Sequence, residues 1–154
     1  MKSSIIKGKT IILLLLLVAG FGSQVSAKGF SFKAEHPAYL HALSNLRAAR
    51  WMIEHRPGDW KQTQDEVIAV QQIDAAIAEI KKAAIDDGKN LQDHPAVEEK
   101  PEHIGRLRMA VEYLMKAREE LNKEEDNAFA QGLKARALSH INGALRATEV
   151  AVHQ

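Results

Sequence analysis

The chain has 154 residues, of which 45% are apolar and 5% aromatic, and this length corresponds to a single domain. Its formal net charge of +1 gives no reason to expect a general nucleic-acid binder, which needs a clustered positive surface. It contains no cysteine, which excludes disulfides, a lipoprotein anchor and a covalently attached c-type haem.

Residues 1–27 have the three-part layout of a secretory signal peptide. Three lysines precede an unbroken apolar run from Ile11 to Val18, and the small residues of Val25-Ser26-Ala27 suit signal peptidase. The run is shorter than the ~20 residues that a membrane-spanning helix needs. We therefore expect cleavage after Ala27, no permanent membrane anchor, and a periplasmic or secreted protein.

The exported chain that remains is mildly acidic. The segment removed holds three lysines and no acidic residue, which leaves 18 basic residues against 20 acidic ones, a net charge of −2. Residues 28–36 then form an extended leader that carries Phe30 and Phe32. These aromatics favour packing of the leader against the domain, and a disordered start is the alternative.

Four segments after the leader have apolar residues at helical spacing, and none alternates as a strand does. The first begins at Pro37, and the second opens with the capping-box pattern Thr63-Gln64-Asp65-Glu66. The third begins near residues 102–104. Asp126 or Asn127 can cap the fourth. The sequence thus predicts an all-α domain.

The two helix pairs are related by an internal repeat at an offset of 68 residues. It predicts a single antiparallel up-down-up-down four-helix bundle over residues 37–154, built from two repeated helical hairpins. The middle connection, about 87–102, is too long for a hairpin turn, and such loops are usually functional or act as lids. The matching residues are Ala42, Leu46, Ala49 and Arg50 with Ala110, Leu114, Ala117 and Arg118, and Ala69, Ile73 and Ala76 with Ala137, Ile141 and Ala144.

An up-down-up-down order brings five of the seven histidines to one end of the bundle, together with several carboxylates. Imidazole and carboxylate are the usual ligands of zinc, nickel and copper(II) in a protein without cysteine. We therefore predict a divalent-metal or small-ligand site at that end, with Asp86 or Asp87 as outer-shell acceptors. The candidate ligands are His36, His41, Asp93, His94 and His103.

No catalytic motif accompanies these residues. The chain has no His-Glu-x-x-His or Glu-x-x-His pair, no nucleophile elbow and no phosphate-binding glycine loop, so we do not expect an enzyme. The hypothesis is an exported, non-enzymatic binding protein. A structural bundle that docks a protein partner is the alternative, and the sequence does not indicate the oligomeric state.

A non-covalent haem protein is a second alternative. The predicted architecture resembles cytochrome b562 and cytochrome c′ in fold only. Axial ligation would then come from His41 with His153, or from Met109.

Three further polar or aromatic features have structural interpretations. Arg50 and Arg118 occupy matching positions, and we expect them to reach helix-borne acids such as Glu54 or Glu119 rather than to bind an anion. His140, whose repeat partner is Gln72, is predicted at the core boundary. Trp51 and Trp60 flank the first hairpin turn and are expected to pack there.

Overall fold

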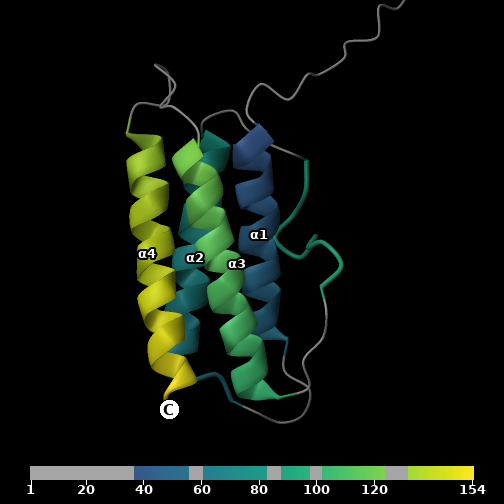
Figure 1. Cartoon of the computed structure of the whole chain (residues 1–154), viewed down its shortest axis with the longest axis vertical. Coiled ribbons are helices and arrows are strands. Elements are labelled where there is room, and N and C mark those ends of the chain that lie inside the picture. Colours follow the sequence, from purple (N-terminus) through teal and green to yellow (C-terminus); the bar gives the residue numbers. More distant parts are fainter. Residues whose placement is uncertain (1–36, 56–60, 83–87, 98–101, 124–131) are drawn as a thin grey trace, which may run out of the picture. The chain divides into compact units, whose positions relative to one another are not determined.

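The computed structural model describes residues 37–55, 61–82, 88–97, 102–123 and 132–154, all of which belong to one compact unit, Lys33–Gln154. The described residues form four helices and no strand, which confirms the predicted all-α domain (Figure 1). The signal peptide, the leader, His36, Trp60, Asp86 and Asp87 lie outside the described residues. The helices are α1 (Pro37–Glu54), α2 (Gln64–Lys82), α3 (His103–Lys123) and α4 (Leu133–Val152).

The helix starts follow from local sequence chemistry. Thr63 and Glu66 form the predicted capping box: the Thr63 N–H donates to Glu66 Oε2 at 3.1 Å, and the Glu66 N–H donates to Thr63 Oγ1 at 3.3 Å. Helix α4 begins after Gly132, whose φ of +81° is a left-handed conformation that suits glycine. The predicted caps Asp126 and Asn127 lie outside the described residues, and the described start of α4 is Leu133.

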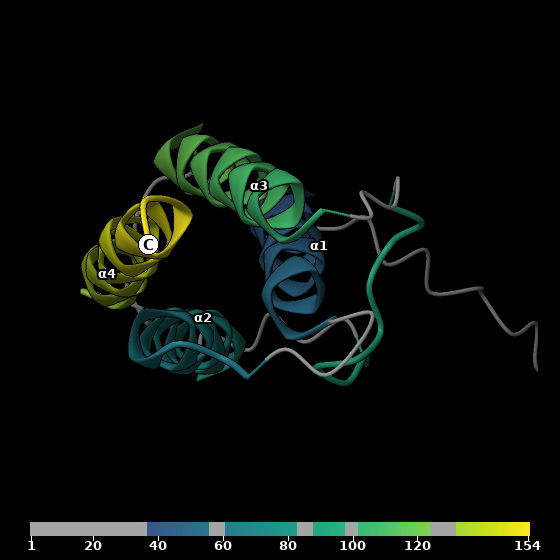
Figure 2. The same ribbon diagram turned by 90° about the horizontal axis from the view of Figure 1, so that it is seen from below.

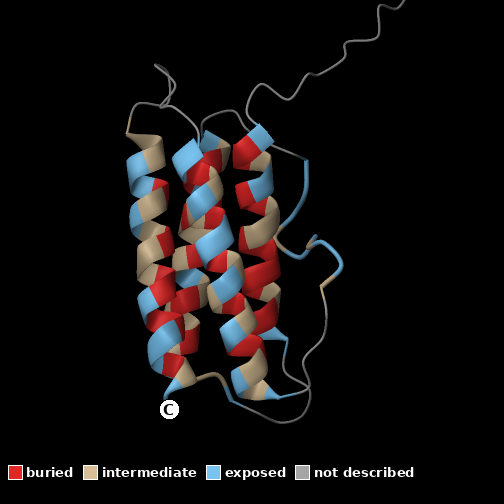
Figure 3. Ribbon diagram, viewed as in Figure 1, coloured by how far each residue is buried: buried red, intermediate tan, exposed pale blue. Residues whose placement is uncertain are grey.

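The core is a continuous layer of aliphatic side chains and alanines along the inner faces of all four helices (Figure 3). Alanine has a small side chain, so the helices approach closely where alanines meet. The main packing joins α1 to α3 and α2 to α4, while α1·α2 and α3·α4 contacts are less extensive. Seen along the helices, α1 and α4 occupy one diagonal and α2 and α3 the other (Figure 2).

Polar contacts fix the directions of the helices. His41 at the start of α1 lies 3.7 Å from Glu120 at the end of α3, and Arg136 at the start of α4 contacts Glu79 at the end of α2. We call this the upper end, as drawn in Figure 1. At the lower end, Glu66 at the start of α2 contacts His103 at the start of α3.

The predicted up-down-up-down order is therefore wrong. Helices α2 and α3 are diagonal and parallel, and every neighbouring pair in the ring is antiparallel. One long crossover connection links α2 to α3, which is the connectivity of ferritin-like bundles and not of simple up-and-down ones. The likeness concerns connectivity alone.

The length of the middle connection explains this order. Helix α2 is about 28 Å long at 1.5 Å per residue, whereas the 20 residues 83–102 can span up to about 66 Å when extended. The connection is thus long enough to return from the upper end to the lower end. Its described part, residues 88–97, runs beside α1 (Figure 1), and Leu91 and Val97 pack against the core.

Truncating either of the matching core leucines should destabilise the bundle strongly. Leu46 and Leu114 are fully buried, so Leu46→Ala and Leu114→Ala should each lower the free energy of unfolding by about 2–5 kcal/mol in chemical denaturation. Val150→Ala, at a side chain that is 49% exposed, is the control and should change it by less than about 0.5 kcal/mol. A near-neutral effect at either leucine would contradict this description of the core.

Candidate functional site

The lower end of the bundle is organised around a buried carboxylate. Glu66, in the first turn of α2, has no exposed surface. Its Oε2 accepts the Thr63 N–H, and its Oε1 is hydrogen-bonded to Nε2 of His103, the first residue of α3. The His103 side chain is 23% exposed, so the pair connects the interior to the surface.

A buried guanidinium lies near the same carboxylate. Arg106 is only 2% exposed and follows His103 within the first turn of α3. Burial lowers the pKa of Arg106, and the negative charge of Glu66 opposes that shift. An isolated charge in such a place would be costly, so the two opposite charges stabilise each other. The lower end therefore contains a polar cluster formed by Glu66, His103 and Arg106, which we call the Glu66 junction.

A cleft of about 480 Å³ opens beside this junction, between the starts of α2 and α3 and the end of α4. Its apolar lining includes Ile104, which is 47% exposed. At its rim, Gln154 Nε2 donates to Asp65 Oδ2 at 2.6 Å. We call it the His103 cleft; its lining residues are Thr63, Glu102, His103, Ile104, Ala151 and Gln154.

The upper end is held by surface charge pairs. Arg136 Nε donates to Glu79 Oε2 at 3.0 Å, and Lys82 Nζ donates to Glu79 Oε1 at 2.7 Å. The hydrogen bonds from Lys82 and then from Arg136 hold the pKa of Glu79 below its ordinary value. The pKa of Glu120 is lowered in the same way, mainly by its hydrogen bond from Lys123, with a smaller contribution from His41.

The predicted metal ligands His41 and His103 do not come together, and His36 lies outside the described residues. His41 lies at the upper end and His103 at the lower end, because the crossover carries the start of α3 away from the start of α1. The same geometry separates His41 from His153, the pair considered for haem ligation. Within the described residues, no group of three or more histidine and acidic side chains could hold a metal ion.

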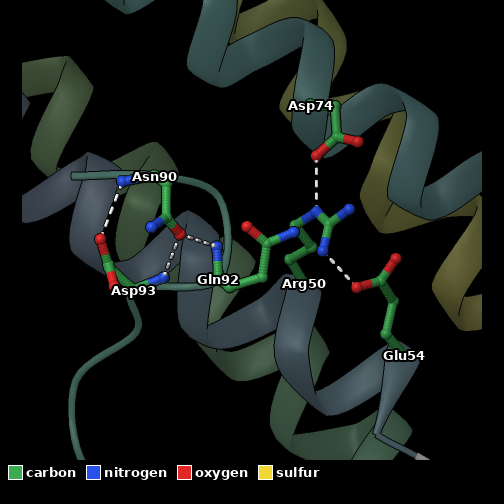
Figure 4. A network of polar contacts seen from close by, with 6 residues as sticks. All are labelled: Arg50, Glu54, Asp74, Asn90, Gln92 and Asp93. Atoms are coloured by element: carbon green, nitrogen blue, oxygen red, sulfur yellow. Dashed lines mark hydrogen bonds and ion pairs between the residues drawn. The ribbon is translucent and has the colours of Figure 1, made fainter.

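The two predicted ligands in the crossover have local partners. Asp93 belongs to a tight turn in which its Oδ2 accepts the Asn90 N–H at 2.9 Å, and Asn90 Oδ1 accepts the N–H groups of Gln92 and Asp93 (Figure 4). The ring of His94 lies 4.7 Å from that of Trp51, which also stacks on His55 at 4.2 Å. The His94–Trp51 contact fastens the crossover to α1, and the contacts of Asp93 hold the turn itself.

The prediction that the matching arginines reach helix-borne acids is confirmed at Arg50. Its guanidinium pairs with Glu54 and donates from Nε to Asp74 Oδ1 at 2.7 Å (Figure 4). Arg118 donates to Asn142 Oδ1 at 3.5 Å, whereas Glu119 pairs with Lys123. Both arginines thus bridge the two helices of their own hairpin.

His140 lies at the core boundary, as predicted, and contacts its repeat partner. Its Nδ1 is hydrogen-bonded to Gln72 Oε1 at 2.8 Å. The Gln72 side chain lies over Gly143, where a Cβ atom would come within 3.0 Å of Gln72 Oε1. The glycine therefore permits this close approach of α2 and α4.

Sequence reasoning missed the buried charges of the Glu66 junction, although helical spacing contains a signal for them. The buried positions of α2 run through Ala69, Ile73 and Ala76 at steps of three and four residues, and one step back reaches Glu66. In the same way, one step back from Ala110 on α3 reaches Arg106. In this chain, both of these charged residues that continue an apolar stripe in register are buried.

Comparisons of this chain with protein-family models, with curated proteins and with solved structures find no match. Among the helices described, none combines the length and the hydropathy that a membrane crossing requires. The functional argument therefore depends on the geometry of the site alone.

Removing the charge of Glu66 should destabilise the fold through Arg106. Glu66→Gln keeps the shape of the side chain but removes the negative charge that stabilises the buried guanidinium, and we expect a loss of about 3 kcal/mol in the free energy of unfolding. The matched control is Glu112→Gln, an exposed residue of α3, which should change stability by less than about 0.5 kcal/mol. Equal effects of the two substitutions would show that Glu66 carries no special role.

The lowered pKa of Glu79 predicts a loss of stability in acid. Because its pKa in the folded state is below the ordinary value of 4.5, its contribution is complete above pH 4.5 and disappears as the pH falls through the folded-state pKa. Glu79→Gln should therefore flatten the fall of unfolding free energy between pH 5 and pH 3, measured by denaturant titration. An acid dependence identical to that of the wild type would contradict the assignment.

Proposed function

We propose that the protein is an exported, non-enzymatic helical-bundle binding protein whose ligand site is the His103 cleft. One observation carries this proposal: a fully buried carboxylate, Glu66, fixes a partly exposed imidazole, His103, at the edge of a cleft with apolar walls. Ligand sites typically combine an apolar lining with a few well-positioned polar groups. The polar groups here are His103, Thr63, Glu102 and Gln154.

A small organic molecule is the favoured occupant. Ile104 and Ala151 offer apolar contact, while His103 and Glu102 offer hydrogen-bonding and charged groups, so the ligand would have an apolar body and one polar or cationic group. A divalent metal would find only His103 and Glu102 as imidazole and carboxylate ligands among the lining residues, fewer than the three or four protein ligands of known zinc sites. A divalent metal ion such as zinc, copper(II) or nickel is therefore the second choice of ligand for the cleft, after a small organic molecule.

A protein partner is the alternative occupant of the same end. Ile104 and Val150, near the start of α3 and the end of α4, are two of the three most exposed large apolar side chains among the described residues. Exposed apolar side chains are a feature of interaction surfaces.

The proposal includes export and an internal duplication. Export is supported by the signal-peptide layout of residues 1–27. The duplication is supported by two matching contacts, Arg50 with Asp74 and Arg118 with Asn142. The two arginines are 68 residues apart, and so are Asp74 and Asn142. The Gln72–His140 hydrogen bond joins two residues with the same separation, as expected where a two-fold axis passes between equivalent helices.

Probe binding to residues 28–154 tests the site. Benzylamine, benzoate and zinc chloride are titrated separately while the backbone amide resonances are followed by NMR. We expect at least one probe to shift the resonances of Thr63, Ile104 and Gln154, and His103→Ala to abolish that shift.

The matched control is His41→Ala, which removes a histidine at the upper end and should leave probe binding unchanged. Shifts confined to the upper end, or no shift at the cleft with any of the three probes, would overturn the proposed site.

A further inference from the structure

The two hairpins depend on each other more than on their own internal contacts. We call α1 with α2 hairpin 1, α3 with α4 hairpin 2, and the contacts between them the seam. The most extensive helix packing, α1 on α3 and α2 on α4, lies across the seam. A separated hairpin would therefore expose its row of buried apolar side chains to water, at a large free-energy cost.

The seam also contains the polar contacts that match one hairpin to the other. Among the described residues they include His41 with Glu120, Gln72 with His140, Glu79 with Arg136, Glu66 with His103, and Asp65 with Gln154 just after α4. Each of them takes one residue from each hairpin.

These contacts select hairpin 2 over a second hairpin 1. By the 68-residue offset, the position of Arg136 corresponds to Ile68 in hairpin 1, and that of Glu120 corresponds to Met52. Two copies of hairpin 1 would thus place Glu79 opposite Ile68 and His41 opposite Met52. Glu79 would keep Lys82 but lose Arg136, and His41 would lose Glu120, in each case to an apolar side chain, so hairpin 1 is specific for hairpin 2.

The covalent link between the hairpins does not require that they come from the same chain. The 20 residues 83–102 greatly exceed the length needed to span the bundle. Lys89 O accepts hydrogen bonds from Lys81 Nζ at 2.8 Å and Arg47 at 3.5 Å, and His94 packs on Trp51. These contacts hold the crossover to hairpin 1.

We propose that a second copy of this chain is a partner of the protein, through exchange of hairpins. In the exchanged dimer, hairpin 1 of each chain packs on hairpin 2 of the other, and every seam contact forms twice. Each His103 cleft then combines Thr63 from one chain with His103, Ile104 and Ala151 from the other. The inference rests on the proposed duplication and does not depend on the identity of any ligand.

Concentration and linker length set the balance between the two forms. A short tether gives an effective concentration of about a millimolar, so the closed monomer dominates in dilute solution. Deleting residues 86–99 leaves six residues that span at most about 22 Å, less than the ~28 Å length of α2. This shortened chain should be a dimer by light scattering, with a helical content per chain equal to that of the intact protein; a folded monomer would overturn the proposal.

A second experiment uses the whole mature chain and charge reversal at the seam. Glu79→Arg and Arg136→Glu each place like charges at the Glu79–Arg136 contact of a monomer. When the two variants exchange hairpins, one bundle pairs Arg at 79 with Glu at 136, and the other retains the native pair. After joint unfolding and refolding at about the millimolar effective concentration of the tether, native mass spectrometry should detect a 1:1 heterodimer in excess over either homodimer.

The matched control pair is Glu112→Arg with Arg146→Glu, two exposed positions outside the seam contacts named above. Mixing these variants should give heterodimer and homodimers in statistical proportion. If the seam variants show no preference over this control, or form no dimer at all, the proposal fails, whether or not the shortened chain folds.

Discussion

The buried carboxylate of Glu66 is the constraint on which the arrangement of the bundle depends. A carboxylate with no exposed surface needs compensating partners, and the structure supplies them from His103 and Arg106 in the first turn of α3. The start of α3 is therefore held beside the start of α2 at the lower end. A parallel, diagonal pair of helices can be joined only by a connection that returns along the bundle, and the 20-residue crossover has that reach. The alternative order would separate Glu66 from both partners.

The same constraint determines what the surface offers. Because α3 starts at the lower end, His103 lies beside Ile104 and the end of α4, and the cleft forms there. His41 is left at the upper end, 3.7 Å from Glu120. A site that would have gathered several histidines is thereby replaced by one imidazole, oriented by a buried acid, at an apolar cleft. This arrangement favours recognition of a small molecule over multidentate coordination of a metal.

The sequence predicts the elements well and their connectivity poorly, for a physical reason. Helical spacing, the Thr63–Glu66 capping box and the pairing of Arg50 with Glu54 are local, so they can be derived from neighbouring residues. Gln72 and His140, which correspond at the proposed 68-residue offset, form a direct hydrogen bond. The order of the helices cannot be derived in this way, because apolar stripes pack equally well in either connectivity. A long loop sets only an upper limit on the distance between the two helix ends that it joins. The order of the helices is decided by the Glu66 junction. Its charged residues occupy stripe positions that a search for apolar residues does not detect.

The most direct test of the helix order that the crossover produces is a pair of distances between spin labels, measured by double electron–electron resonance. The chain has no cysteine, so labels can be attached to cysteines introduced at exposed positions without other changes. Labels at 41 and 119 should lie close together, because His41 contacts Glu120. Labels at 41 and 102 should be at least about 25 Å apart, the rise along the helix between positions 102 and 119. A short 41–102 distance with a long 41–119 distance would establish the up-down-up-down order and contradict the account.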